Sequence, residues 1–198
     1  MLKIKTNSKL VEPGDTFVAI KGNTVDGHKY IEEAIKKGAK FIIAEHGEYR
    51  VPTLIVPDTT EYLKEHLKEE YAKDFNNLKF IGITGTNGKT TTALLTSETL
   101  NELGESSAYI GTVGFYINGK LVKELPNTTP DILSLYNLIY EAKEQGVKYI
   151  VMEVSSHALS LGRIEGINFD AAAFTNLTED HLDYHKTMEE YLKAKQKF

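Results

Sequence analysis

The chain has 198 residues, 41% of them hydrophobic and 26% charged, which is a globular composition with length for one large or two small domains. Its formal net charge of -5 argues against a generic nucleic-acid binder, because nonspecific affinity for phosphate backbones needs clustered Lys and Arg. The absence of cysteine excludes disulfides, thiolate metal sites and cysteine nucleophiles. Residues 1–10 lack the apolar core of a signal peptide, and no run approaches the roughly 18 apolar residues of a membrane span. We therefore expect a cytoplasmic protein that binds neither nucleic acid nor membrane.

Short strands alternating with helices are predicted for the first part of the chain. The pattern indicates strands at residues 16–20, 41–44 and 53–56, and a helix from about residue 28 to residue 37 that Gly38 closes. Asp58 and Glu61 have the spacing of a capping box and open a charged helix that runs out at residues 76–77. This α/β rhythm predicts a first domain at residues 1–77.

The pattern restarts after residue 78 and predicts a second α/β domain at residues 78–198. A strand at 80–84, a glycine-bearing loop and a helix to about residue 103 come first, and Gly104 ends that helix. A hairpin around Asn118 and Gly119, a helix at 131–145 and a strand at 149–152 follow. The chain stops at Phe198 inside a helical pattern, so we expect a truncated second domain.

A phosphate-binding loop is the strongest local motif. The run GITGTNGKTT (residues 82–91) lies between an apolar strand and a helix, as a P-loop requires. Small residues let backbone N–H groups approach phosphate oxygens, while Lys89 can reach the terminal phosphates and Thr90 can bind Mg²⁺. Ile83 stands where the general template has a glycine, so Gly85 supplies the turn. The alternative is an ordinary glycine-rich turn between a strand and a helix.

Two acidic features could hold a metal. Glu153 ends the apolar strand, as the metal-binding acid beside a P-loop does, although such a glutamate can also be solvated surface. Residues 179–185 (EDHLDYH) concentrate metal-binding and proton-transferring groups, among them His181 and His185. They make a poor zinc site because a third ligand at zinc spacing is missing, and the alternative is a polar loop with two satisfied histidines.

Two further runs predict sugar or phosphate contacts. They are PNTTPD (126–131), just before a helix, and SSH (155–157), just after Glu153, and each also fits helix capping or turn chemistry. A serine hydrolase is disfavoured because Ser155 and Ser156 lack a G-x-S-x-G nucleophile elbow.

Together the runs GITGTNGKTTT, PNTTPD, MEVSSHALSLGR and NLTEDHLDYH, followed by YLKAK, resemble the central ATPase domain of the Mur ligases. The N-terminal run TNSKLVEPGDTFVA (6–19) resembles the UDP-binding domain of the MurE branch, with Ser8 retained and Asn7 and Lys9 in place of the usual Asp and Arg. The resemblance implies a small UDP-binding α/β domain followed by a truncated P-loop ATPase domain.

What the resemblance implies for function is amide ligation that uses ATP and Mg²⁺. The D-Glu carboxylate of UDP-MurNAc-L-Ala-D-Glu would be phosphorylated, and the amine of a free amino acid would displace phosphate, with no obligate protein partner. Catalysis of such a step depends on positioning and charge neutralisation. The third domain of the family, which selects meso-diaminopimelate or L-lysine, would lie beyond Phe198, so we expect the fragment alone to be inactive.

The resemblance also assigns roles to single residues. ATP would be held by Gly85, Thr86, Asn87, Gly88, Lys89, Thr90 and Thr91. Metal ligands would be Thr90, Glu153, His181 and a carbamylated Lys195, and Lys89, Glu153, His181 and Lys195 would be catalytic. The UDP-MurNAc-dipeptide would contact Ser8, Asn127, Thr128, Thr129, Ser155 and Arg163, while Leu161 stands where some relatives have Gln.

Two alternatives stay open. The chain could belong to another ligase of the superfamily, such as a MurF-type or folylpolyglutamate-type enzyme, although the N-terminal pattern and HLDYH favour the MurE branch. It could also be a UDP-sugar-binding or ATP-binding fragment without turnover.

Overall fold

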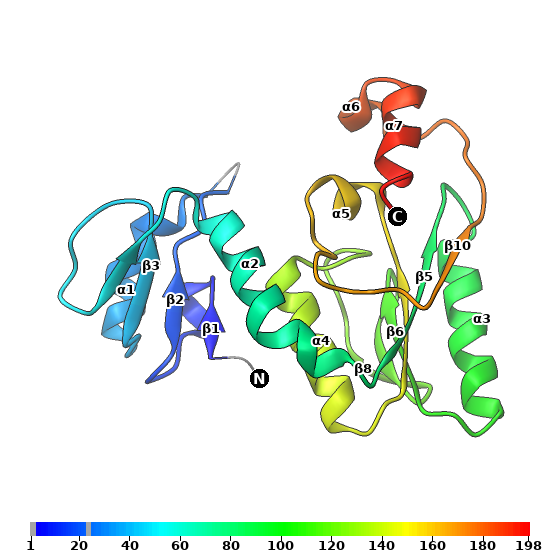
Figure 1. Cartoon of the computed structure of the whole chain (residues 1–198), viewed down its shortest axis with the longest axis horizontal. Coiled ribbons are helices and arrows are strands. Elements are labelled where there is room, and N and C mark those ends of the chain that lie inside the picture. The colour runs from blue at the N-terminus through cyan, green and yellow to red at the C-terminus, as the bar shows by residue number, and fades with distance from the viewer. Residues whose placement is uncertain (1–2, 23–24) are drawn as a thin grey trace. The chain divides into compact units, whose positions relative to one another are not determined.

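A computed structural model describes residues 3–22 and 25–198, which form two compact units, Met1–Glu70 and Tyr71–Phe198 (Figure 1). The first unit ends at Glu70, a few residues before residue 77, where the sequence predicts the boundary between the two functional domains. That functional boundary stays a prediction. Each unit has a largely parallel β-sheet, so the predicted α/β class is confirmed.

The first unit is a four-stranded parallel sheet in the order β1-β2-β3-β4. The strands are Ile4–Lys5, Thr16–Val18, Phe41–Ala44 and Thr53–Ile55. Its helical segments are η1 (Ser8–Leu10), η2 (Gly27–Tyr30), α1 (Ile31–Lys36) and α2 (Thr59–Tyr71), the last of which continues into the second unit. The side chains of Phe17, Ile31 and Ile42 are fully buried between the sheet and α1, because this face repeats apolar residues at strand and helix spacing.

Local sequence signals account for several boundaries in this unit. The predicted helix at 28–37 forms as η2 and α1, and Gly38 follows it with a φ of 102° that L side chains rarely adopt. Asp58 Oδ1 accepts hydrogen bonds from the N–H groups of Thr60 (2.7 Å) and Glu61 (3.0 Å), which confirms the predicted cap of α2.

The second unit is a six-stranded sheet in the order β10-β5-β9-β6-β7-β8. Its strands are β5 (Lys79–Thr84), β6 (Ser107–Gly111), β7 (Gly114–Ile117), β8 (Lys120–Lys123), β9 (Tyr149–Glu153) and β10 (Ala171–Phe174). β10, β5, β9 and β6 run parallel, and β7 and β8 add an antiparallel hairpin. The carboxyl ends of the four parallel strands therefore share one edge, where α/β proteins place their sites.

Helices cover this sheet and crowd its carboxyl edge. They are η3 (Ala72–Phe75), α3 (Lys89–Glu102), α4 (Ile132–Glu144), α5 (Ser156–Ser160), α6 (Leu182–His185) and α7 (Met188–Lys195). Figure 1 shows α3 and α4 on opposite faces of the sheet and α5, α6 and α7 gathered near the end of the chain. Contacts of α7 with α5 and α6 bring residues 182–195 next to the segment that follows β9.

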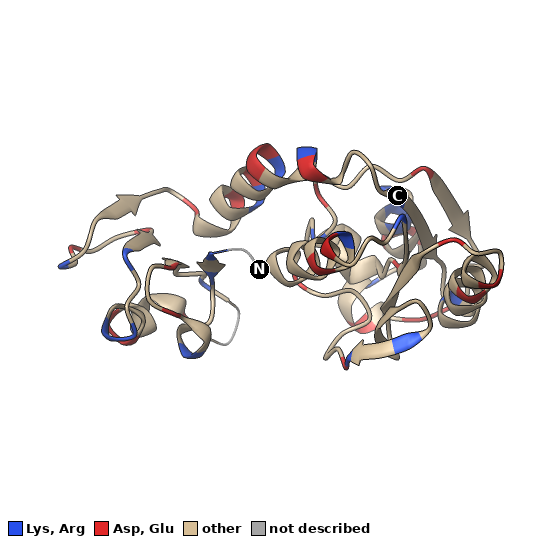
Figure 2. Ribbon diagram, turned by 90° about the horizontal axis from the view of Figure 1, so that it is seen from below, with Lys and Arg blue, Asp and Glu red and all other residues tan. Residues whose placement is uncertain are grey.

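The turn predictions in this unit are confirmed. Asn118 and Gly119 have positive φ values of 48° and 75° at the tip of the β7–β8 hairpin. Gly104, with a φ of 83°, follows the end of α3 as predicted, and Gly146, with a φ of 76°, follows the end of α4 in the same way. Acidic and basic residues are interspersed over both units, and α2 carries both signs (Figure 2). Among the described residues, no helix has the length and apolar character that crossing a membrane demands.

Candidate active site

The loop between β5 and α3 has the conformation that the P-loop motif predicts. Gly88 caps α3 with a φ of 83°, and Gly85 has a φ of 138° and lies so close to Thr175 that a Cβ would overlap the Thr175 hydroxyl. The first N–H groups of a helix have no partner within the helix, so those of α3 can bind an anion. Ile83 is 1% exposed in the core of the sheet, which explains why an apolar residue serves there instead of glycine.

Lys89 folds back over this loop. Its Nζ donates hydrogen bonds to the carbonyl oxygens of Gly85 (3.0 Å) and Thr86 (2.8 Å). Burial lowers the pKa of Lys89, and the nearby Glu153 and Asp180 carboxylates act against that shift. The ammonium group is thus poised at the mouth of the loop with carbonyl partners that phosphate oxygens can replace.

Glu153 is fully buried at the end of β9, so the alternative of a solvated surface glutamate is wrong. Its Oε2 accepts hydrogen bonds from the hydroxyls of Thr90 (2.9 Å) and Thr112 (3.3 Å). Its Oε1 accepts from the Thr112 N–H (2.9 Å) and the Tyr109 hydroxyl (2.5 Å). The predicted pair of Thr90 and Glu153 is therefore brought together, and two hard oxygen donors of this kind suit Mg²⁺.

The segment that follows β10 ties down the tip of the loop. The Asn176 side chain accepts from the Asn87 N–H (3.0 Å) and donates to the Asn87 carbonyl (3.0 Å), while the Thr86 N–H donates to the Asn176 carbonyl (2.9 Å). The Thr86 hydroxyl is bonded to the Thr178 backbone and to the Tyr191 hydroxyl. Thr86 and Asn87 are thus the points at which this segment holds the loop. The sequence motifs assign no role to Asn176, which makes three of these contacts.

Lys195 lies on α7 with only 2% of its surface exposed. Its Nζ donates to the same Gly85 carbonyl (2.8 Å) that Lys89 contacts, and it lies 4.7 Å from the centre of the Tyr191 ring. Burial, reinforced by the charge of Lys89, lowers the pKa of Lys195 to about 8. Lys193 differs in every respect, because it is exposed and pairs with Glu189 at 2.8 Å. The structure therefore brings Lys195, and not Lys193, to the loop.

The histidines of residues 179–185 pack around His157. The rings of His157 and His181 are 5.0 Å apart, and His181 Nε2 lies 3.6 Å from an Asp180 oxygen. His185 is buried, with its Nε2 2.9 Å from the Ser156 hydroxyl, as the alternative of satisfied histidines predicts for this residue. Among the described residues, no group of three or more His, Asp or Glu side chains has the arrangement of a metal site. The assignment of His181 as a metal ligand stays a prediction.

Some of the predicted substrate residues make hydrogen bonds within the protein, and others are more accessible to a ligand. Thr129 is fully buried, and its hydroxyl donates to the Glu153 carbonyl (2.9 Å) and accepts from the Ser155 N–H (3.0 Å). The Ser155 hydroxyl caps α5, and Arg163 Nη1 donates to the Thr129 carbonyl (2.9 Å). Asn127 is exposed, and the hydroxyl of the half-buried Thr128 is hydrogen-bonded to the Thr112 hydroxyl at 3.0 Å.

Ser8 belongs to the first unit and is 5% exposed. Its hydroxyl donates to Glu33 Oε2 (3.0 Å), and the neighbouring Asn7 side chain caps η1 by accepting from the Lys9 N–H. Asn7 thus has a local structural function where the family usually has Asp.

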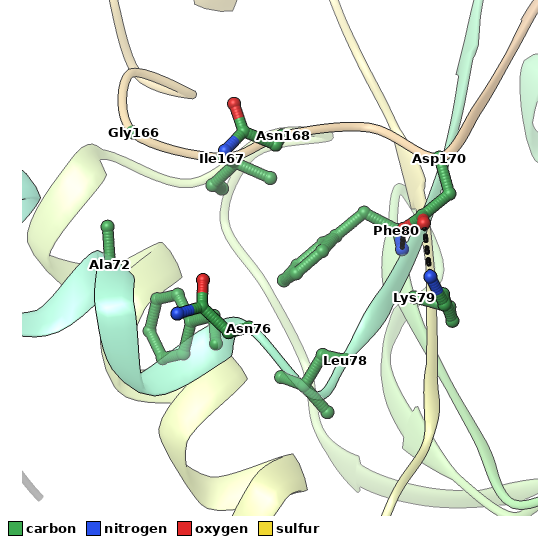
Figure 3. Close-up of a pocket in the computed structure, with 10 residues that line it drawn as sticks. Ala72, Asn76, Leu78, Lys79, Phe80, Gly166, Ile167, Asn168 and Asp170 are labelled. Atoms are coloured by element: carbon green, nitrogen blue, oxygen red, sulfur yellow. Dashed lines mark hydrogen bonds and ion pairs between the residues drawn. The ribbon is translucent and has the colours of Figure 1, made fainter.

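A pocket of about 130 Å³ lies at the start of β5, at the end of this strand opposite to the phosphate-binding loop (Figure 3). Phe75, Leu78 and Phe80 line its apolar side, and at its rim Asp170 accepts from Lys79 Nζ (2.7 Å) and the Phe80 N–H (2.9 Å). Lys79 begins β5, whereas the phosphate-binding loop follows the last residue of that strand. This pocket is therefore separate from the site around Glu153.

A parallel sheet, a P-loop after its strand β5 and a carboxylate at the end of the adjacent β9 define a P-loop type of nucleotide-binding protein. Comparison with known families narrows this class. Residues 83–198 match the Mur ligase middle domain, and residues 3–74 match a domain described as Mur ligase family, catalytic domain. The chain belongs to the Mur ligase family, and the resemblance seen in its motifs is confirmed.

Individual relatives agree with the family assignment. The UDP-N-acetylmuramoyl-L-alanyl-D-glutamate--2,6-diaminopimelate ligase of Parabacteroides distasonis is 45% identical over 98% of this chain and 41% of its own length. A solved structure of an enzyme of the same name has a TM-score of 0.78 at 33% identity, covering 98% of this chain and 40% of the other. MurF ligase from Thermotoga maritima, solved in complex with ADP, has a TM-score of 0.69 at 25% identity, covering 99% and 42%. The chain thus spans about two fifths of the length of the relatives it matches.

Proposed function

We propose that this chain carries the nucleotide-binding and UDP-binding parts of a cytoplasmic ligase of peptidoglycan synthesis. The reaction is the ATP-dependent addition of a diamino acid, as the third residue, to UDP-MurNAc-L-Ala-D-Glu. The observation that carries the proposal is the convergence of Lys89, Lys195 and the buried Glu153 on one P-loop. The names of its relatives support the same substrate class.

The chemistry demands charge neutralisation first. Transfer of a phosphoryl group from ATP to a carboxylate brings two anions together, so catalysis must come mainly from cations and positioning. The N–H groups at the start of α3 hold phosphate oxygens, and Lys89 exchanges its carbonyl partners for them. The Thr90 hydroxyl and Glu153 Oε2, 2.9 Å apart, would hold Mg²⁺ with His181, and the ion would neutralise the phosphates.

Lys195 has a second role in this proposal, as a carbamate. A neutral amine can add to CO₂ and release a proton, and with a pKa of about 8 roughly a tenth of Lys195 is neutral at pH 7. The product carries two oxygens and a negative charge in place of an ammonium group. That change converts a group that repels a divalent cation into one that can bind it.

The substrate is bound by residues that lie just before α4 and just after β9. Asn127 offers an exposed polar group and Thr128 a half-buried hydroxyl, and Arg163 has the planar charged group that holds phosphate or carboxylate. Thr129 and Ser155 shape this surface from within, and Ser8 serves the uridine end in the first unit. The second substrate is a free diamino acid, and no protein partner takes part.

Replacement of Lys89 tests the proposal in the complete enzyme. Lys89→Ala leaves the phosphate charge uncompensated, so we expect ATP-dependent formation of the tripeptide product to fall by about 10²–10³ or more. Lys79→Ala is the matched control, because Lys79 is an exposed cation at the other end of the same strand. Near-normal turnover by Lys89→Ala, or an equal loss in Lys79→Ala, would show that the loop is not the ATP site.

A further inference from the structure

Tyr109 is fully buried in β6, and the proposed mechanism gives it no role. Its ring packs in the cluster formed by Ile83, Ala93 and Val151, between the sheet and α3, and meets Tyr116 edge to face at 5.9 Å. A phenol buried this deeply needs a hydrogen-bond partner. Its partner is Glu153 Oε1, at 2.5 Å.

We propose that Tyr109 is a positioning residue that fixes the Glu153 carboxylate and so selects which of its oxygens faces the divalent cation. This inference rests on the proposed function, which makes Glu153 a metal ligand. Nothing in the family resemblance assigned a role to this position.

The two oxygens of Glu153 have different surroundings, and this difference supports the proposal. Oε1 accepts from the Tyr109 hydroxyl and the Thr112 N–H, two donors held by β6 and the turn after it. Oε2 accepts from two hydroxyls, those of Thr90 and Thr112. A hydroxyl can rotate its proton away and offer a lone pair to a cation. Oε2 and the Thr90 hydroxyl can therefore turn to a metal together while Oε1 stays anchored.

The backbone of β6 is built to allow this anchor. A Cβ at Gly111 would overlap both the Tyr109 hydroxyl and Glu153 Oε1, so only glycine leaves room for their contact. Partners of this kind orient metal ligands and typically contribute about 10- to 100-fold to metal affinity.

The test measures the binding of Mn²⁺, as a probe for Mg²⁺, to the complete enzyme in the presence of a non-hydrolysable ATP analogue. Electron paramagnetic resonance detects the Mn²⁺. Tyr109→Phe keeps the ring and removes only the hydroxyl, and we expect the Kd for Mn²⁺ to rise about 10-fold or more. The concentration of Mg²⁺ needed for half-maximal turnover should rise in parallel. Tyr136→Phe is the matched control, since it removes another buried hydroxyl, bonded to the Glu165 carbonyl at 2.9 Å. It should leave the Kd for Mn²⁺ unchanged.

A third variant separates the two proposals. If Glu153→Gln binds Mn²⁺ as tightly as the wild type, the proposed function fails, because Glu153 is then no metal ligand. If Glu153→Gln loses Mn²⁺ but Tyr109→Phe matches Tyr136→Phe, the positioning role of Tyr109 is overturned and the proposed function stands.

A measurement on the unsubstituted enzyme covers the case in which Tyr109→Phe does not fold. The chemical shift of ¹³Cζ in labelled Tyr109 reports on the hydrogen bond of the phenol. It should keep the value of a donor to a carboxylate when Mg²⁺ and the ATP analogue are added, and a change to the value of a free phenol would contradict the proposal.

Discussion

Replacing Thr129 by valine should destabilise the second unit without creating a cavity, because the two side chains have nearly the same shape. The Thr129 hydroxyl is fully buried and joins the Glu153 carbonyl to the Ser155 N–H, at 2.9 and 3.0 Å. Valine would leave both backbone groups without this partner. Thr129 therefore supports the site by stabilising the fold around it, even though the family resemblance predicts a substrate contact at this residue.

The size of the effect follows from these two backbone groups. An unsatisfied buried donor or acceptor costs about 1–3 kcal/mol, so the two together give roughly 2–6 kcal/mol. Ser155 is only partly buried, so water can reach its N–H and the lower part of that range applies. We expect the free energy of unfolding to fall by about 2–4 kcal/mol.

Urea unfolding of the 198-residue chain, followed by circular dichroism, measures this loss as a lower midpoint for the unit that contains Thr129. Thr96→Val is the matched control, because the Thr96 hydroxyl bonds the Thr92 carbonyl (2.7 Å) within α3, where the helix supplies that carbonyl with another donor. It should change stability by less than about 0.5 kcal/mol. Thr128→Val should likewise keep stability while weakening substrate binding in the complete enzyme. Equal midpoints for Thr129→Val and Thr96→Val would refute the reasoning.

Two further substitutions test the lysine on α7 and the support of the loop. Lys195→Ala should inactivate the complete enzyme, with partial rescue by acetate, while Lys193→Ala keeps activity because Lys193 is exposed and paired with Glu189. Full activity of Lys195→Ala, or inactivity of Lys193→Ala, would rule out the carbamate. Asn176→Ala removes two hydrogen bonds to the backbone of the loop, so the KM for ATP should rise about 10-fold, whereas Asn168→Ala at the opposite pocket should leave it unchanged. Equal KM values would show that Asn176 does not hold the loop.

The parts of the site that sequence predicted are those encoded by neighbouring residues. Strand, loop and helix around Lys89 follow one another within a short stretch, and the glycines there have the positive φ values that the motif requires. Glu153 was found because it ends an apolar strand. The turn at Asn118 and Gly119 was found because that pair favours a two-residue hairpin.

The remainder could not be read because it depends on contacts between distant segments. Tyr109 meets a carboxylate 44 positions away, and Asn176 meets a loop 89 positions away. Three strands were also missed, β1 (IK), β6 (SAYIG) and β10 (AAAF), since these short segments lack the alternation of a half-buried strand. Small residues such as the alanines of β10 become a strand through pairing with β5, a tertiary effect that overrides local propensity.

The sharing of the Gly85 carbonyl by two lysines lowers one part of the cost of releasing Lys89 from the loop. When Lys89 turns to a phosphate, it leaves the carbonyl oxygens of Gly85 and Thr86. A buried carbonyl without a partner would oppose that movement, but Lys195 still donates to the Gly85 carbonyl. A carbamylated Lys195 keeps one N–H on the same nitrogen, so it can continue to satisfy this carbonyl while its charge changes sign. The lysine that is proposed to serve the metal would therefore also free the lysine that is proposed to serve ATP.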